Sequence, residues 1–471
     1  MTDIYQRYHA AADRMDGLID MTPTPTDSSR EAVTDRAHMR MSRLREFLAT
    51  IGNPHLGRPV IHVSGTSGKG STSTIISAIL TAAGYRTGMH TSPYLQTPAE
   101  KLQVDGRFIA PEAYADLVDA FFVAHTAWLE DGKEPLTYGE AFNVLMWMFF
   151  RKENVDVAVV EVGAGGRFDL TNILEPTLCV ITSVGIDHTA TLGNTIADIA
   201  WHKAGIIKPG VPVVSGVPKQ EAKEIIRAEA VEQGAPLFQI DIDSLISEVE
   251  LGSGGTRWRE TTTNVTHRMR IAGSFQARNG QLSVAAMRVL RDYGFAISDD
   301  AIATGLLRAR IAGRAELIAD KVPIILDGAH NAEKVAAFAA DVPDLLPCPD
   351  GNRIVVAGLL DAKAGDEMIA SLVPVMDILV ATSPQVLAKE AKFTSEIKDY
   401  AQAAGFEGEV YSQPDPLKAI DLALELARPG LDSIVVTGSL YLVGNIRERW
   451  YPEAVILESR SAWAESSVTP S

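Results

Sequence analysis

Cysteine, long apolar runs and positive charge are all scarce in this sequence of 471 residues. The two cysteines, Cys179 and Cys348, lack the spacing that a zinc site or a disulfide framework requires, which fits a reducing compartment. No uncharged stretch of about 18 residues occurs and the charged N-terminal segment has no apolar core, so neither a membrane span nor a signal peptide is indicated. The 60 acidic and 43 basic residues give a net charge of −17, which argues against wrapping of nucleic acid or anionic membrane. We expect a cytoplasmic monomer that acts on small molecules, with no nucleic-acid or membrane partner.

Hydrophobic residues make up 46% of the chain, which is ample for burial, and the length indicates more than one domain. Apolar runs alternate with helical patterns, as in a parallel sheet covered by helices. The first series of runs comprises 60–63, 155–162, 178–183 and 211–215. The second series comprises 322–326, 354–357, 378–381 and 434–437. We predict an α/β fold, with a phosphate-loop ATPase domain over 1–310 and a Rossmann-like α/β domain over 311–471. The first domain has a mostly parallel sheet, and short β-prone pieces at 237–272 predict a small antiparallel insertion in it.

The segment after the first apolar run is the most informative part of the chain. It is a glycine loop that precedes a helical pattern, and it consists of Gly65, Thr66, Ser67, Gly68, Lys69, Gly70 and Ser71. Glycines let successive N–H groups point inward, the helix N-terminus adds positive potential, and Lys69 supplies a cation, so we expect a nucleoside triphosphate here. The spacing differs from the standard Walker pattern, because a glycine separates Lys69 from Ser71. A flexible turn between a strand and a helix is the alternative.

Polar side chains also follow other apolar runs. Glu161 ends a run beside a glycine turn, Ser92 lies in a turn after a predicted strand, and Asp187 and His188 follow a third run. Magnesium binds a few hard oxygen ligands and keeps its waters, so one carboxylate, one hydroxyl and phosphate oxygens suffice for a site. Taken singly, these residues also suit a salt-bridge partner, a turn residue and a structural histidine.

Four further residues are candidates on local grounds. Lys203 lies on a predicted helix among apolar neighbours, and a buried lysine needs a partner or a modification. Asp327 and His330 follow an apolar strand of the second domain, where Asp327 also suits a helix cap. Arg314 offers a planar, permanently charged donor for phosphate, or is a surface arginine.

With these residues in view, the chain resembles the folylpolyglutamate synthase and dihydrofolate synthase family, within the Mur ligase group of ATP-dependent amide-forming enzymes. The likeness runs from about Arg43 to Arg447. It rests on nine segments in family order: GNPHLGRPVIHVSGTSGKGST, TSPYL, EVGAGGRFDLTN, ITSVGIDHTATLGNT, IAWHKAGIIKPG, FQARN, GRAE, LDGAHN and VVTGSLYLVG.

The resemblance implies a role for each matched residue. Residues 65–71 match the triphosphate loop, and Lys69, Glu161, His188 and Lys203 match catalytic positions. The positions that match ligands of one or two Mg²⁺ ions are Ser71, Ser92, Glu161, His188 and Lys203. Lys203 matches the lysine that is carbamylated in this group, a modification that turns a cation into an oxygen ligand. The positions that match ATP contacts from the linker and the second domain are Asn279, Arg314, Asp327 and His330.

The implied reaction transfers the γ-phosphoryl group of ATP to a substrate carboxylate, and the amine of L-glutamate then displaces phosphate from the acyl phosphate. Because water destroys an acyl phosphate, closure of the two domains about a hinge near residues 295–313 is expected.

The likeness weakens where the family holds its pteroate. Gly139 replaces an aromatic residue, Tyr94 replaces a histidine, and Ala99, Glu100 and Lys101 replace a run that contains arginine. We expect a folate or dihydropteroate acceptor, and a relative that uses a non-folate carboxylate is the alternative. A catalytically inactive nucleotide-binding protein would have lost Glu161, His188 or Lys203, and a small-molecule kinase would not need the LDGAHN and IAWHKAGI segments.

Overall fold

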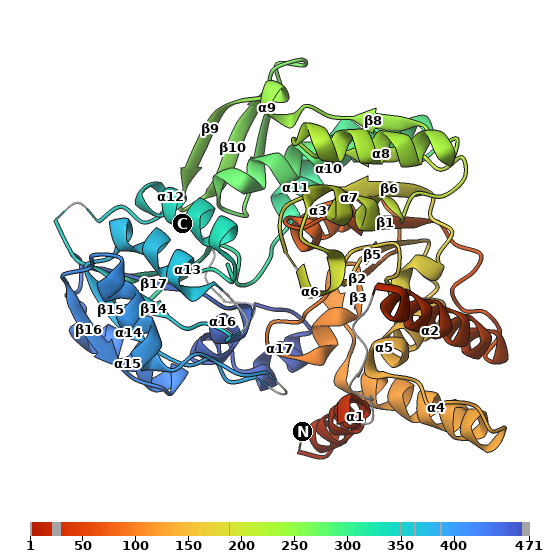
Figure 1. The fold of residues 1–471 in the computed structure, drawn as a ribbon, viewed down its shortest axis with the longest axis horizontal. Helices are drawn as coiled ribbons and strands as arrows, with labels where there is room; N and C mark the ends of the chain where they lie inside the picture. The colour runs from red at the N-terminus through yellow and green to blue at the C-terminus, as the bar shows by residue number, and fades with distance from the viewer. Residues whose placement is uncertain are drawn as a thin grey trace. The chain divides into compact units, whose positions relative to one another are not determined.

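The computed structural model describes residues 2–20, 30–187, 189–348, 350–361, 364–386 and 389–463 (Figure 1). The chain divides into two compact units. Unit 1 contains Met1–Leu245, Asn279–Leu306 and Ala454–Ser471, and unit 2 contains Ile246–Arg278 and Leu307–Glu453. The predicted TPTPTDSSR loop at 22–30 lies almost entirely outside the described residues.

Unit 1 is built on a mostly parallel sheet with the strand order β4-β3-β2-β5-β1-β6-β7-β8. Its strands are β1 (Val60–Ser64), β2 (Thr87–His90), β3 (Gln103–Val104), β4 (Arg107–Phe108), β5 (Val157–Glu161), β6 (Leu178–Ile181), β7 (Val213–Ser215) and β8 (Leu237–Gln239). Only the β2–β3 and β3–β4 pairs are antiparallel. Every residue of β1, β5 and β6 is buried, as expected for strands with helices on both faces.

The register of the central strands sets where the chain can bind a ligand. Val63 of β1 pairs with Glu161 of β5, and Ser64 pairs with Ile181 of β6. The three strands therefore end at one edge of the sheet. Ligands of open α/β sheets bind beyond the carboxyl ends of strands, and the segments that leave these strands are the ones that carried the sequence motifs.

Helices surround the sheet of unit 1. They are α1 (Thr2–Asp20), α2 (Arg30–Thr50), α3 (Lys69–Ala82), α4 (Pro111–Glu130), α5 (Tyr138–Lys152), α6 (Thr189–Leu192), α7 (Ile196–Ala204), α8 (Gln220–Glu232) and α9 (Ile242–Leu245), with the 3₁₀ turns η1 (Pro98–Lys101) and η2 (Leu170–Ile173). Apolar residues of α7 and α8 share a buried cluster with β6 and β7 (Figure 1). In the described parts of the chain, no helix combines the length and apolar character that a bilayer span requires.

The antiparallel strands form a sheet of their own, with the order β11-β10-β9. They are β9 (Ile246–Gly252), β10 (Gly255–Glu260) and β11 (Thr266–Met269), and the GSGG turn joins the first two as predicted. The expected start of this region at residue 237 is wrong, because Leu237–Gln239 pairs in parallel with β7. The sheet clusters with unit 2. Two helices continue the chain across the division between the units, α10 (Ser274–Asp292) and α11 (Asp299–Arg308).

Unit 2 has a sheet with the order β12-β13-β17-β14-β15-β16. Its strands are β12 (Glu316–Ala319), β13 (Pro323–Leu326), β14 (Arg353–Ala357), β15 (Ile378–Ala381), β16 (Glu409–Ser412) and β17 (Ser433–Thr437). Its helices are α12 (Ala332–Leu345), α13 (Gly365–Leu372), α14 (Thr394–Ala403), α15 (Pro416–Leu426) and α16 (Leu440–Arg447), with the 3₁₀ turn η3 (Val373–Val375), and α17 (Glu453–Ser459) leads back to unit 1. All pairs except β12–β13 are parallel, so the predicted α/β class is confirmed for both units.

Candidate functional site

The glycine loop lies between β1 and α3, as the sequence predicted. Gly68 is the N-cap residue of α3 and has left-handed backbone angles, φ 82° and ψ −5°. No side chain caps the first turn of α3 in this described segment, so its N–H groups are left for a ligand. Nζ of Lys69 donates to the carbonyl oxygen of Gly65 at 3.1 Å, which folds the lysine back over the loop.

Thr182 and Ser183, which follow β6, fix the shape of this loop. The N–H of Thr66 donates to the carbonyl oxygen of Ser183 at 3.0 Å, and the N–H of Ser67 donates to its hydroxyl at 2.9 Å. The hydroxyl of Thr182 donates to the carbonyl oxygen of Ser67 at 2.6 Å. A Cβ atom at position 65 would lie 1.8 Å from the Thr182 hydroxyl, so only glycine fits there. Sequence reasoning missed these two positions, although two hydroxyl residues at the end of the predicted run 178–183 were a signal.

Glu161 lies beside the start of α3. Its side chain is 5% exposed, and Oε2 accepts the N–H of Ser92 at 3.0 Å. The same oxygen lies 3.5 Å from where a Cβ atom of Gly70 would be. The structure thus brings the strand end, the turn after β2 and the glycine loop together. Ser71, in the first turn of α3, is buried.

Lys203 is 3% exposed on α7, so the expectation of a buried lysine is confirmed. Its helix packs against the glycine turn that follows β5. A Cβ atom at Gly166 would lie 3.1 Å from the carbonyl oxygen of Lys203. The N–H of Arg167 donates to the carbonyl oxygen of His202 at 2.7 Å. His188 lies outside the described residues. Within the described ones, His, Cys, Asp and Glu nowhere gather in groups of three or more that suit a metal ion.

Asn279, on α10, lies against the glycine loop. A Cβ atom at Gly68 would be only 2.3 Å from its side-chain oxygen Oδ1. The linker asparagine that the sequence singled out is therefore in direct contact with the phosphate-loop candidate within unit 1.

The other three candidates meet in unit 2. Asp327 is buried, and its carboxylate accepts the N–H groups of Ala315 and Ala329, both at 2.8 Å. Burial raises the pKa of Asp327, and the nearby Arg314 opposes that rise. Nδ1 of His330 is 2.8 Å from the carbonyl oxygen of Gly328. The reading of Asp327 as a helix cap is wrong, because the side chain that caps α12 is Asn331.

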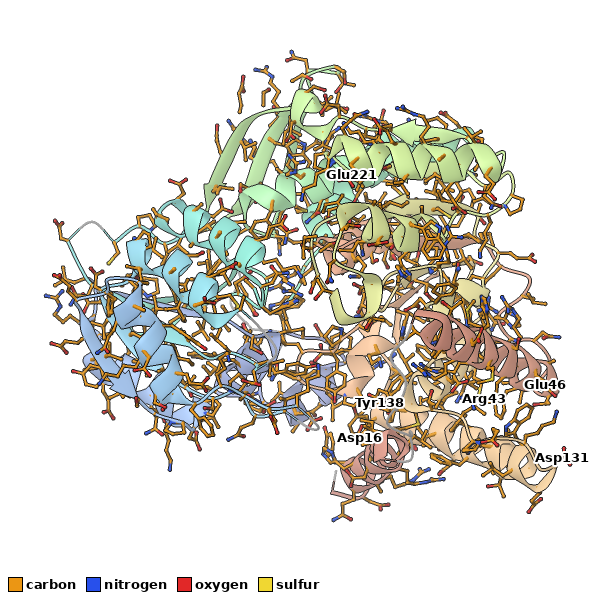
Figure 2. The ribbon with its side chains drawn as sticks, viewed as in Figure 1. Asp16, Arg43, Glu46, Asp131, Tyr138 and Glu221 are labelled. Atoms are coloured by element: carbon orange, nitrogen blue, oxygen red, sulfur yellow. The ribbon has the colours of Figure 1, made fainter. Side chains whose placement is uncertain are left out.

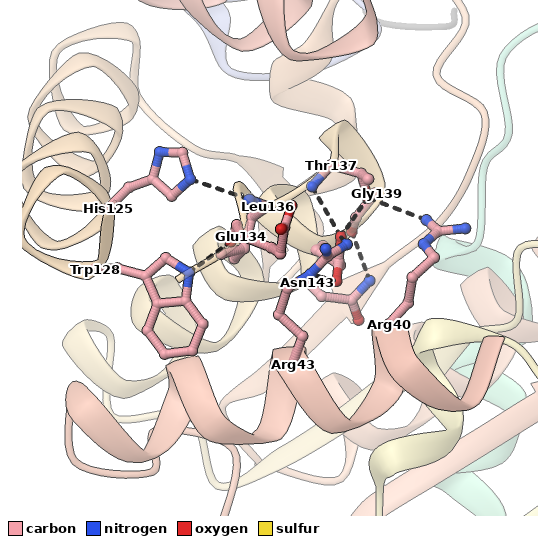
Figure 3. A network of polar contacts seen from close by, with 10 residues as sticks. Arg40, Arg43, His125, Trp128, Glu134, Leu136, Thr137, Gly139 and Asn143 are labelled. Atoms are coloured by element: carbon pink, nitrogen blue, oxygen red, sulfur yellow. Dashed lines mark hydrogen bonds and ion pairs between the residues drawn. The ribbon is translucent and has the colours of Figure 1, made fainter. Parts of the chain in front are cut away.

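The segment Thr137–Glu140, where an aromatic residue is replaced by glycine, opens α5 with a capping box. Arg43 of α2 binds both carboxylate oxygens of Glu140, at 2.8 and 2.7 Å, and Arg40 donates to the Thr137 hydroxyl at 3.1 Å (Figure 3). A Cβ atom at Gly139 would lie 3.1 Å from Leu170 and 3.5 Å from the Arg40 guanidinium. This position is closely packed, and an aromatic ring would displace its neighbours.

Comparison with known proteins agrees with this arrangement. Residues 63–287 match the Mur ligase middle domain, and residues 313–440 match the Mur ligase glutamate ligase domain. The chain is thus a Mur ligase, an ATP-dependent ligase that forms carbon–nitrogen bonds.

Similar proteins and similar solved structures identify the family of Mur ligases to which the chain belongs. The chain is 34% identical to the dihydrofolate synthase/folylpolyglutamate synthase of Bacillus subtilis, over 87% of this chain and 94% of the relative. It resembles the Mycobacterium tuberculosis folylpolyglutamate synthase solved with ADP and AMPPCP, with a TM-score of 0.80 and 27% identity over 94% of this chain and 98% of that one. It also resembles Escherichia coli FolC solved with DHPP and ADP, with a TM-score of 0.76 and 25% identity over 93% and 97%. The chain belongs to the folylpolyglutamate synthase and dihydrofolate synthase family.

Proposed function

We propose that this chain joins L-glutamate to the carboxylate of a folate or dihydropteroate through an acyl phosphate, at the expense of ATP. The observation that carries the proposal is the meeting of the uncapped glycine loop, Glu161 and Ser92 at one sheet edge. The relatives bearing the folylpolyglutamate or dihydrofolate synthase name support the choice of substrates.

In this proposal residues 65–71 hold the triphosphate. The αL conformation of Gly68 starts α3 without a side-chain cap, so its first N–H groups face the phosphates, and Lys69 releases its bond to Gly65 to neutralise them. Asn279 supports the loop from α10. Arg314, Asp327 and His330 supply the ATP contacts of unit 2, where the buried carboxylate of Asp327 orders the backbone around Arg314.

The residues around Glu161 fit a magnesium site. A buried carboxylate and nearby serine hydroxyls form the hard-oxygen set that Mg²⁺ prefers, and we assign Ser71, Ser92, Glu161, His188 and a carbamylated Lys203 to one or two ions. Mg²⁺ would supply charge neutralisation of the phosphates. The carbamate would give Lys203 an oxygen ligand, and its buried position on α7 supports a role inside the protein rather than at its surface.

The chemistry then needs three events. The acceptor carboxylate attacks the γ-phosphorus and ADP leaves, the glutamate amine attacks the resulting acyl phosphate, and phosphate leaves as the amide forms. The protein's part is to position the two reactants, neutralise charge through Lys69 and keep water away. We place the two domains at 1–310 and 311–471, except that residues 246–278 group with the second domain. We also place the hinge near 295–313 and the enzyme in the cytoplasm as a monomer.

The test is phosphate release with each substrate omitted in turn. Release is expected only when ATP, L-glutamate and dihydropteroate or a reduced folate are all present. Turnover with a non-folate carboxylate and with none of the folates would contradict the assigned acceptor. That outcome has one observation in its favour, because Arg40 and Leu170 pack around Gly139 where the family places a ring.

A further inference from the structure

Lys101, the last residue of η1, is a buried ammonium in an aromatic setting. Its side chain is 7% exposed, and Nζ lies 3.6 Å from the ring centroid of Phe142 and 4.9 Å from that of Tyr138. These contacts are cation–π interactions, which satisfy charge but no N–H donor. In the part of the chain that the structure describes, no oxygen accepts a hydrogen bond from Nζ. The three donors of the ammonium therefore have no protein acceptor among the described residues.

One acidic group and one neutral imidazole lie near Lys101, and neither forms an ion pair with it. Asp16 of α1 attracts the ammonium of Lys101 without forming an ion pair with it. His90 of β2 binds the carbonyl oxygen of Lys101, and burial keeps the pKa of that imidazole at about 3, so it stays neutral. Burial also lowers the pKa of Lys101 to about 7.

A second buried polar group lies in the same cluster. The hydroxyl of Tyr114 on α4 has no hydrogen-bond partner, and burial raises its pKa, with smaller contributions from Tyr8, Tyr138 and Asp16. Buried donors that serve only the fold normally end on an acceptor, since an unsatisfied one costs about 1–3 kcal/mol. Both Lys101 and Tyr114 thus offer donors that no protein acceptor takes, which points to a ligand atom at this cluster.

The chain path links this cluster to the reaction site. The segment that begins at Ser92, whose N–H binds Glu161, ends nine residues later at Lys101. We propose that Lys101 is a specificity-determining residue, whose ammonium donates hydrogen bonds to an oxygen at the end of the acceptor remote from the carboxylate that is activated. This inference rests on the proposed function. The oxygen belongs either to a carbonyl of a pterin ring or to a second carboxylate.

The test uses Lys101→Met, which keeps the length and removes the donors. Exposed Lys152 on α5 supplies the control Lys152→Met. At pH 6.5 we expect Lys101→Met to raise the KM for dihydropteroate at least tenfold, with kcat and the KM for ATP within twofold. The melting temperature should be equal or higher, because a buried ammonium whose donors lack protein acceptors is gone. An unchanged acceptor KM would mean that Lys101 is structural.

Direct binding gives a readout that does not depend on turnover. Calorimetry without ATP compares dihydropteroate with glutarate, in the wild type and in Lys101→Met. Only the charged form of Lys101 donates fully, so affinity should be constant below pH 7 and fall up to tenfold per pH unit above it, and Lys101→Met should remove this dependence. His90 is neutral throughout this range, because burial keeps its pKa at about 3.

The two proposals fail differently. One outcome would overturn the folate acceptor and support the role of Lys101. In that outcome no folate is ligated, and the wild type binds glutarate more tightly than Lys101→Met does. Equal binding of each probe by both proteins, or no binding of either probe to the wild type, would overturn the role of Lys101.

Discussion

At the scale of single residues, the glycine at position 68 is the sharpest test of the phosphate loop. An alanine there would take an unfavourable φ of +82° and place its Cβ atom 2.3 Å from Asn279. Gly84→Ala is a matched control, since φ is +93° and nothing lies within 4 Å. Both changes should cost about 1 kcal/mol of stability through the backbone.

Only Gly68→Ala should also distort the loop. We expect it to lower the rate of phosphate release more than tenfold and to raise the KM for ATP, while Gly84→Ala leaves both within twofold. Steady-state kinetics and thermal unfolding separate the two effects. Equal kinetics in the two variants would contradict the assignment of this loop to ATP.

Glu161→Gln tests the carboxylate itself. The amide oxygen can still accept the N–H of Ser92, so the melting temperature should stay within about 3 °C, in keeping with a loss below about 1 kcal/mol. Loss of the charge should reduce phosphate release at least about 100-fold, the scale typical of a lost electrostatic catalytic group. The exposed Glu221, changed to Gln, is the control (Figure 2). Full activity of Glu161→Gln would remove this residue from the reaction.

The positions of site residues that belong to a local sequence pattern were predictable. The positions of residues that reach the site through long-range contacts were not. The loop, Glu161 and Ser92 follow strand ends, and parallel strands bring their carboxyl ends to one edge, so their meeting follows from sequence order. Thr182 holds Ser67 from 115 residues away, and no local pattern reports such a pairing. The placement of Arg40 beside Gly139 depends on how α2 packs, which sequence period alone does not fix.

At the scale of elements, α2 and α5 are joined by a buried ion pair. Glu140 is fully buried, and it accepts from Arg43 and from the N–H and hydroxyl of Thr137 (Figure 3). Arg43→Met would leave the carboxylate buried with only the capping-box donors. We expect a loss of about 3 kcal/mol in the free energy of unfolding, which is the scale of a broken buried pair.

The same helix supplies the control. Glu46 of α2 pairs with Lys133 at an exposed position, so Glu46→Gln should cost no more than about 1 kcal/mol. Urea unfolding of both variants measures the difference. If the two losses are equal, the Arg43–Glu140 pair does not stabilise this helix contact.

Element type was predictable where the apolar pattern was continuous. Strands such as β5 and β17 are entirely buried and were predicted within two residues of their bounds. The edge strand β16 was not, because its residues EVYS are partly or fully exposed and carry no apolar run. The short strand β8 was assigned to the wrong sheet, since three residues do not reveal their partner.

At the scale of the whole molecule, each of the two units is formed by more than one segment of the chain. Residues 246–278 cluster with unit 2, to which they contribute part of the core through Leu251 and Ala272. The N–H and hydroxyl of Ser274 both donate to Asp341 on α12, at 2.7 and 3.0 Å. Although these residues precede position 310, their contacts belong with the second unit.

Hydrogen exchange in the full chain can test whether these strands share the stability of unit 2. Arg447 is fully buried and binds both carboxylate oxygens of Glu316, at 2.8 and 2.9 Å. Arg447→Met leaves Glu316 without its cation and should destabilise unit 2 by about 3 kcal/mol. Amides of β9–β11 should lose protection together with those of β13 and β17, while β1 and α3 keep theirs. Protection of β9–β11 that follows β1 instead would show that these strands unfold with unit 1, as a boundary at residue 310 requires.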